Sequence, residues 1–126
     1  MKKLFLIIPI LLTAVFGCQK EPAEKPTAKI RTNLVDNTVA KQKKFTLYLD
    51  QTHGDFITYF KGETPKKTYR KDDPSVSGTA IEAKDSVQVN SYPLAGTFTF
   101  TLLAVSYGNW GGERLEAVDS ITITVQ

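Results

Sequence analysis

Apolar and polar residues alternate with a period of two through much of the chain after residue 26. The alternation is clearest at 97–102, where threonines occupy one face and aromatic or aliphatic residues occupy the other. It recurs at 45–50, 87–90 and 121–125. Because successive side chains of a strand point to opposite faces of the sheet, this pattern predicts half-buried β-strands.

Shorter β-candidates fill the intervals between these segments, at 28–35, 56–60, 66–70 and 76–83. Clusters of glycine, proline and aspartate separate them and predict turns. No stretch has the periodicity of a convincing amphipathic helix. The sequence therefore predicts an all-β antiparallel sandwich of about seven strands, forming one domain over residues 27–126.

The first 17 residues have the three parts of an export signal. Lys2 and Lys3 form a positive start, residues 4–16 are apolar, and the small residue Gly17 ends the segment. A membrane-spanning helix needs about 20 apolar residues, whereas this run is shorter and contains Pro9. We expect residues 1–17 to be a cleaved signal peptide.

Charge and cysteine content narrow the function classes. The chain has 16 lysines and arginines against 13 aspartates and glutamates, and two of those lysines lie in the leader. A nearly neutral exported domain is a poor candidate for nucleic-acid binding. Its single cysteine has no internal partner, so stability must come from sheet packing without a disulfide.

Cys18 follows the apolar run directly and precedes a polar, proline-spaced stretch. It lies outside any β-pattern, and a thiol in a flexible stretch lacks the positioned base that a nucleophile needs. Pairing with another chain and attachment of lipid remain as alternatives. Residues 15–18, Val-Phe-Gly-Cys, resemble the lipobox of bacterial lipoproteins, although Phe16 is larger than usual for its position. The resemblance implies cleavage after Gly17 and acylation of Cys18, for example with palmitate, while ordinary signal-peptide cleavage is the alternative.

Residues 18–26 would then be the lipidated cysteine and a flexible linker. The eight residues after Cys18 include two prolines and four charges, and they span at most about 26 Å when extended. Gln19 replaces the aspartate associated with inner-membrane retention in lipoproteins, and the charged stretch after it resembles surface-export signals of Bacteroidota lipoproteins. The resemblance implies an outer-membrane lipoprotein, facing either the periplasm or the cell surface.

The C-terminal part carries a second resemblance. Residues 92–102 and 119–125 resemble the PKD-type immunoglobulin-like fold, in which a tyrosine, a glycine-threonine-aromatic strand and a final isoleucine-threonine-valine strand recur. The W-x-F-G-D-G turn of that family is absent. Residues 56–63 and the pair Tyr69-Arg70 resemble instead the opening immunoglobulin-like domain of Bacteroidota surface lipoproteins of unknown function.

The segment 107–112 is the candidate ligand site, with Tyr107, Asn109 and Trp110 as its binding residues. It places the only tryptophan among three glycines in a predicted loop, where an aromatic ring has room to project. Such a ring can stack on a sugar or anchor a protein. The alternative is that Trp110 folds back over the edge of the sandwich.

Other polar clusters support less specific chemistry. The basic run 66–71 suits either an anionic polymer or the protection of an edge strand against sheet pairing. Glu63, Asp72 and Asp73 have oxygen ligands for calcium but no known calcium-loop spacing. His53 has no second histidine to share a zinc ion with. No catalytic motif is present, so we expect no enzyme activity, no metal and no cofactor.

These observations predict a membrane-anchored lipoprotein that displays an immunoglobulin-like binding module. Its ligand would be a glycan or an outer-membrane protein partner in a nutrient-uptake complex. The alternative is a structural spacer or adhesion module without a small-molecule ligand. A third hypothesis is an accessory chain of a hydrolase whose catalytic part is another protein.

Overall fold

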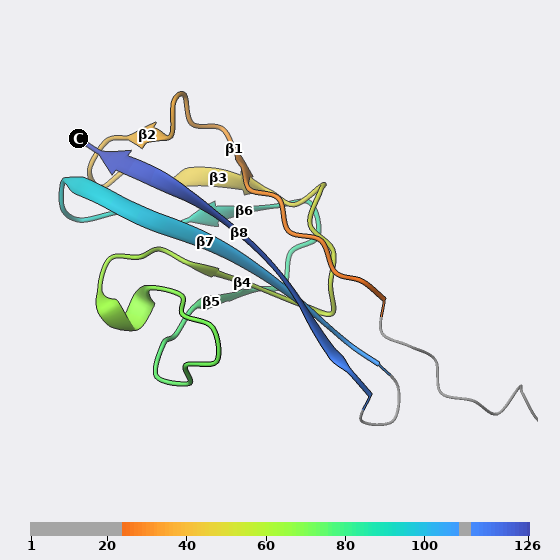
Figure 1. The fold of residues 1–126 in the computed structure, drawn as a ribbon. Helices are drawn as coiled ribbons and strands as arrows, with labels where there is room; N and C mark the ends of the chain where they lie inside the picture. Colours follow the sequence, from red (N-terminus) through yellow and green to blue (C-terminus); the bar gives the residue numbers. More distant parts are fainter. Residues whose placement is uncertain (1–23, 109–111) are drawn as a thin grey trace, which may run out of the picture.

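The computed structural model describes residues 24–108 and 112–126, and this part of the chain is almost entirely β (Figure 1). Its elements in chain order are the strands β1 (Arg31–Thr32), β2 (Thr38–Val39), β3 (Phe45–Tyr48) and β4 (Phe56–Phe60), the 3-10 helix η2 (Pro65–Lys67), and the strands β5 (Thr79–Ile81), β6 (Ser86–Val89), β7 (Gly96–Tyr107) and β8 (Arg114–Val125). The predicted all-β class is confirmed.

The strands form two sheets, one of three strands in the order β1-β3-β6 and one of five in the order β2-β8-β7-β4-β5. The sequence predicts about seven strands, whereas the described residues form eight. The candidate strand at 28–35 is reduced to β1, and β2 forms beyond it in the other sheet as a strand that the sequence did not predict. Between them the chain turns through Asp36 and Asn37, which have φ of 53° and 52°. Asparagine and aspartate tolerate this left-handed conformation better than most residues.

The expectation of a wholly antiparallel sandwich is wrong at one pair. After the turn β2 runs parallel to β8, with Thr38 opposite Thr124, and Gln126 donates a backbone hydrogen bond to Val39. The chain has crossed from one sheet to the other at this point, so it reaches β8 without the hairpin that would make the pair antiparallel. The other strand pairs among the described residues are antiparallel.

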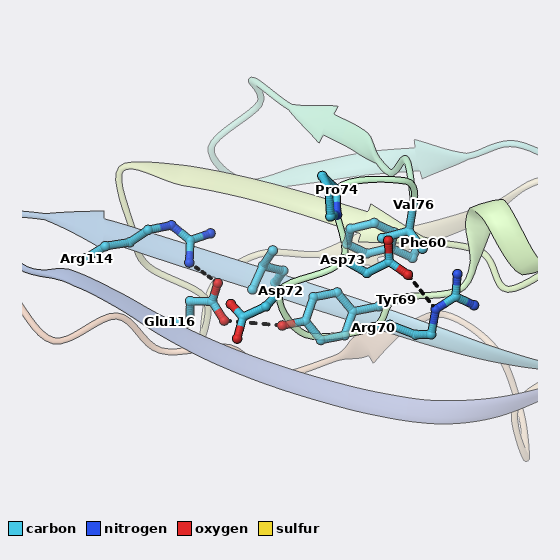
Figure 2. A pocket seen from close by; sticks show the side chains of 10 residues that line it. Phe60, Tyr69, Arg70, Asp72, Asp73, Pro74, Val76, Arg114 and Glu116 are labelled. Carbon is cyan, nitrogen blue, oxygen red and sulfur yellow. Dashed lines mark hydrogen bonds and ion pairs between the residues drawn. The ribbon is translucent and has the colours of Figure 1, made fainter.

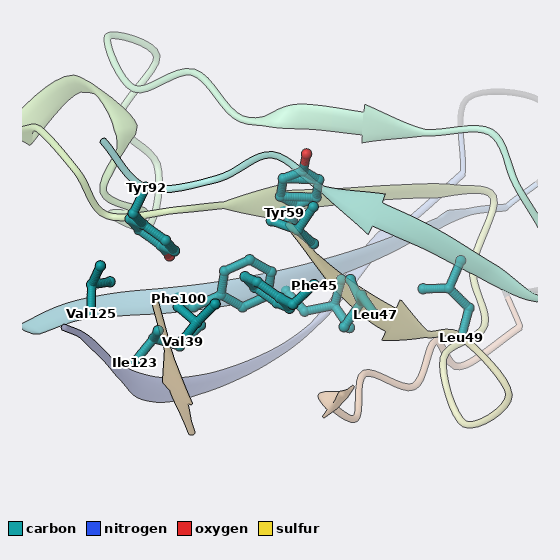
Figure 3. Packing of buried hydrophobic residues seen from close by; sticks show 11 residues of the cluster. Val39, Phe45, Leu47, Leu49, Tyr59, Tyr92, Phe100, Ile123 and Val125 are labelled. Atoms are coloured by element: carbon teal, nitrogen blue, oxygen red, sulfur yellow. The ribbon is translucent and has the colours of Figure 1, made fainter. Parts of the chain in front are cut away.

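The core lies between the two sheets and is centred on Phe100 of β7 (Figure 3). Its ring meets Phe45 of β3 edge-on at 5.8 Å and stacks on Tyr59 of β4 at 5.6 Å. Phe45 belongs to the three-stranded sheet and Tyr59 to the five-stranded sheet, so this cluster joins the two layers. The buried residues of the core are Val39, Phe45, Leu47, Leu49, Tyr59, Val89, Tyr92, Phe100, Leu102, Ile123 and Val125.

Strand β7 is buried on both of its faces from Phe100 to Ser106. Phe100 and Leu102 point into the main core, while Leu103 and Val105 belong to a second cluster on the outer face of the sheet. The strand is also much longer than the six-residue pattern at 97–102 predicts. Leu103 and Val105 are apolar on the face where 97–102 has threonine, which is the pattern of a strand covered on both sides.

The outer face is covered by the connection between β4 and β5, residues 61–78 (Figure 1). The prediction of a strand at 66–70 is wrong, because Pro65–Lys67 forms a 3-10 helix with proline in its first turn. The Thr68 hydroxyl donates a hydrogen bond of 2.8 Å to the Thr64 carbonyl and closes this turn. The basic run therefore does not protect the edge of a sheet, as an edge strand would.

Two contacts hold the start of the connection against the sandwich. Gly62 has φ of +76°, and a Cβ at this position would lie 2.2 Å from the Thr99 carbonyl oxygen, so only glycine fits. The buried Tyr92 hydroxyl donates a hydrogen bond of 2.8 Å to the Lys61 carbonyl, and its ring stacks on Phe98 at 4.9 Å. Burial raises the pKa of the Tyr92 hydroxyl, which therefore stays protonated as a donor.

We predict that Phe100→Ala lowers the free energy of unfolding by about 3–5 kcal/mol, because it leaves a cavity where the two sheets meet. The matched control is Leu94→Ala, since Leu94 is 71% exposed and its truncation leaves no cavity. Urea unfolding followed by circular dichroism measures both variants. Equal losses of unfolding free energy in the two variants would contradict the placement of Phe100 at the centre of the core.

Candidate functional site

A groove of about 480 Å³ lies on the outer face of the five-stranded sheet, between the β4–β5 connection and strands β7 and β8 (Figure 2). Its lining residues are Phe60, Tyr69, Arg70, Asp72, Asp73, Pro74, Val76, Leu103, Arg114 and Glu116. Strand residues form its floor, and the connection forms its opposite wall. The groove therefore combines apolar and aromatic surface with five charged side chains at one place.

The apolar part of the groove is built around two aromatic rings. Phe60, at the end of β4, and Tyr69, in the connection, lie 5.3 Å apart with their rings tilted by 53°. Both pack in the outer cluster with Leu103, and Val76 closes it from the connection. The rings reach the same groove from segments that only the fold brings together.

A chain of hydrogen bonds crosses the groove from the connection to β8. The Tyr69 hydroxyl donates to Glu116 Oε2 at 3.2 Å, and the other Glu116 oxygen pairs with the Arg114 guanidinium. Arg114 Nε donates in turn to the Tyr107 hydroxyl at 3.3 Å. Figure 2 shows the bond from Tyr69 to Glu116, and the charge of Asp72 is close enough to contribute to the raised pKa of the Tyr69 hydroxyl.

These contacts set the protonation of the two groups at the centre of the chain. Desolvation, followed by the nearby charge of Glu116, raises the pKa of Tyr69, so its hydroxyl is a hydrogen-bond donor at neutral pH. The hydrogen bond with Tyr107 and then that with Glu116 raise the pKa of Arg114, so its guanidinium stays charged. Donors and acceptors are thus fixed in place before any ligand arrives.

The far wall of the groove is held by Asp73. Its Oδ1 accepts hydrogen bonds from the Ser75 hydroxyl at 2.6 Å and the Ser75 backbone N–H at 2.9 Å. Its Oδ2 accepts one from Arg70 Nε at 2.9 Å, and Arg70 also donates to the Pro65 carbonyl. The Ser75 hydroxyl, the Ser75 N–H and Arg70, in that order, lower the pKa of the Asp73 carboxyl to about 2.

A second hollow, of about 530 Å³, lies between the β3–β4 and β5–β6 loops, but it offers fewer kinds of contact to a ligand. Its lining includes His53, Asp55, Glu82 and Lys84 and no aromatic ring other than the imidazole. His53 is exposed, and its backbone pairs with Thr27. The outer-face groove is the better candidate because it joins aromatic rings to charged groups that hold one another in position.

The structure places one of the predicted ligand residues beside this groove. Tyr107 ends β7, is 47% exposed and holds Arg114 at the groove edge through its hydroxyl. Asn109 and Trp110 lie outside the described residues, as do Cys18 and the whole predicted leader. Their roles stay predictions.

Sequence reasoning missed Arg114, Glu116 and Phe60 as site residues. Arg114 and Glu116 are two apart in a strand, which puts them on one face of the sheet, and that spacing was a usable signal. Nothing in the sequence indicated that Tyr69, 47 positions before Glu116, would bond to it. That contact depends on the path of the β4–β5 connection.

Two of the three acidic residues weighed as calcium ligands, Glu63 and Asp73, are engaged with other partners. Glu63 forms ion pairs with Lys61 at 3.0 Å and Lys67 at 3.9 Å, and Asp73 is held by Arg70 and Ser75. Within residues 24–108 and 112–126, no group of three or more histidine, cysteine, aspartate or glutamate side chains is arranged to hold a metal ion.

Comparison of the chain with protein-family models, with curated proteins and with solved structures gives no match. In the part of the chain that the structure describes, no helix has the length and apolar character needed to cross a membrane. The assignment of the candidate site therefore rests on the geometry of its residues.

We predict that the Asp73 carboxyl titrates near pH 2 in the folded protein, below its ordinary value of 3.8. A lowered pKa means that the ionised carboxylate stabilises the fold above pH 3.8 and that this contribution is lost as the pH falls toward 2. Carbon-detected NMR titration measures the midpoint directly.

The matched variant for this titration is Ser75→Ala, which removes the hydroxyl donor and keeps the backbone donor. It should raise the Asp73 pKa, because the carboxylate loses the hydrogen bond from the Ser75 hydroxyl. An Asp73 midpoint that is the same in both proteins would contradict the hydrogen-bond network described here.

Proposed function

We propose that this protein is an outer-membrane lipoprotein that displays an immunoglobulin-like, PKD-type sandwich and binds a neutral glycan in the outer-face groove. The glycan proposal rests on one observation. The Phe60 and Tyr69 rings line the same groove as charged side chains that already form ion pairs with each other. The resemblances of the leader and of the C-terminal strands support the lipoprotein setting and the fold type.

A protein binds a sugar through two kinds of contact, with aromatic rings and with hydrogen-bonding groups held in fixed positions. The apolar face of a pyranose ring packs on an aromatic side chain, and its hydroxyls exchange hydrogen bonds with polar groups in fixed positions. Arg114 and Glu116 are held by Tyr107 and Tyr69, so little side-chain entropy is lost when a ligand binds.

The charge of the groove favours a neutral ligand over an acidic one. Two guanidinium groups, of Arg70 and Arg114, face three carboxylates, of Asp72, Asp73 and Glu116. Both arginines already form ion pairs within the groove. An acidic polysaccharide would have to break these pairs and approach a surplus of negative charge, whereas a neutral one would not.

We predict that Arg114→Ala weakens binding of a neutral oligosaccharide roughly 10- to 100-fold, because it removes a charged hydrogen-bond donor worth about 1.5–3 kcal/mol. Tyr69→Phe should cause a smaller loss of affinity, because it keeps the aromatic ring and removes only the hydrogen bond to Glu116. Isothermal titration with a panel of neutral and acidic oligosaccharides measures both variants.

Lys84→Ala is the matched control, since Lys84 lies in the second hollow and its removal should leave affinity unchanged. Tighter binding of acidic than of neutral sugars would contradict the charge argument. A flat response over the whole panel would remove the glycan proposal and favour a spacer or a module that docks a partner protein.

We predict that Cys18→Ser moves the protein from the detergent phase to the aqueous phase when expressing cells are extracted. The substitution removes the thiol that would carry the lipid, and two or more acyl chains are needed for stable anchoring. Phase partition and the intact mass of the purified protein measure the change. An unmodified mass for the unsubstituted chain would contradict the lipid anchor.

A further inference from the structure

The chain enters the sandwich at one defined end. Pro26 is buried, and Thr27 forms two backbone hydrogen bonds of 2.9 Å with His53, in the loop before β4. Lys29 N–H then bonds to the Thr52 hydroxyl at 3.1 Å. Figure 1 shows that the described chain begins at the same end of the molecule as the end of β7 and the start of β8.

An exposed pair of aromatic rings lies at this same end. Phe56, the first residue of β4, is 62% exposed, and Tyr107, the last residue of β7, is 47% exposed. Their rings meet edge-to-face at 5.7 Å. Large apolar surfaces that stay in contact with water in this way are frequently interaction sites.

Short hydrogen bonds connect the entry point to the ring pair. Asp55, two residues after His53, donates its backbone N–H to the Val105 carbonyl at 2.8 Å. Its side chain accepts the Tyr107 backbone N–H at 2.9 Å. The ring pair is therefore fixed rigidly beside the point from which the N-terminal segment leaves the domain.

We infer that the Phe56–Tyr107 ring pair contacts the lipid headgroup region of the membrane that holds Cys18. The inference rests on the lipid anchor of the proposed function. Residues 19–26 are only eight residues long and reach at most about 26 Å, so the end of the domain that contains Thr27 is held within that distance of the bilayer. Tyrosine favours the boundary between headgroups and acyl chains, and phenylalanine favours the apolar side of that boundary.

The contact depends on the rings and the tether rather than on net charge. Lys25 and Lys29 flank Thr27 in the sequence, Asp55 follows His53 by two residues, and Asp50 forms an ion pair with Arg31, so charges of both signs occur at this end. A lipid on Cys18 alone would leave the domain free to rotate on its linker. A second attachment through the rings restricts that rotation and gives the groove a fixed orientation to the membrane.

The test places a single fluorophore at either end of the lipidated full chain. Trp110→Phe removes the natural tryptophan, and Phe56→Trp or Leu94→Trp supplies one elsewhere. Leu94 is the matched control because it is 71% exposed, and it precedes Gly96, which pairs with Val125 at the opposite end. Both proteins are reconstituted into phosphatidylcholine vesicles brominated near the headgroups.

We expect the Phe56→Trp protein to lose fluorescence in brominated vesicles and the Leu94→Trp protein to keep it. Tyr107→Trp is the second variant if Phe56→Trp does not fold, and it should lose fluorescence too. Vesicles that retain the protein without quenching at either ring position would overturn the ring contact and leave the anchor intact. Protein that does not remain with the vesicles, with Cys18 unmodified by mass, would overturn the anchor itself and this inference with it.

Discussion

Strand β7 has no face open to water over much of its length, and the remaining structure follows from that constraint. Its inner face supplies Phe100 and Leu102 to the core between the sheets, and its outer face presents Leu103 and Val105. An apolar outer face must be covered, so the connection from β4 to β5 folds across it. Without a disulfide in the described residues, this two-sided burial is the main source of stability that the chain has.

The same cover produces the groove. The connection is long enough to place Tyr69 and Val76 over β7, but it leaves the start of β8 open beyond them. Arg114 and Glu116 lie at this opening, where they bond to tyrosines from two other segments. The connection covers the apolar sheet face, which stabilises the fold. The same connection also forms the edge where aromatic and charged groups meet.

The sequence predicted the strands better than it predicted the site. Alternation located β3, β6, the first half of β7 and the C-terminal end of β8, because a half-buried strand has a period of two. It underestimated β7, since a strand buried on both faces loses that period, and it mistook the proline-initiated turn at Pro65 for a strand. The link from Tyr69 to Glu116 spans 47 positions and depends on how the connection folds, which no local pattern records.

We propose that this module binds its ligand in the outer-face groove. The most direct measurement is the two-dimensional amide NMR spectrum of residues 19–126 during titration with a neutral oligosaccharide mixture. We expect shifts grouped at Phe60, 69–76, Leu103 and 114–116, with the signals of the hollow around His53 and Lys84 unchanged. Saturable shifts grouped on another surface, with the groove signals unmoved, would contradict it.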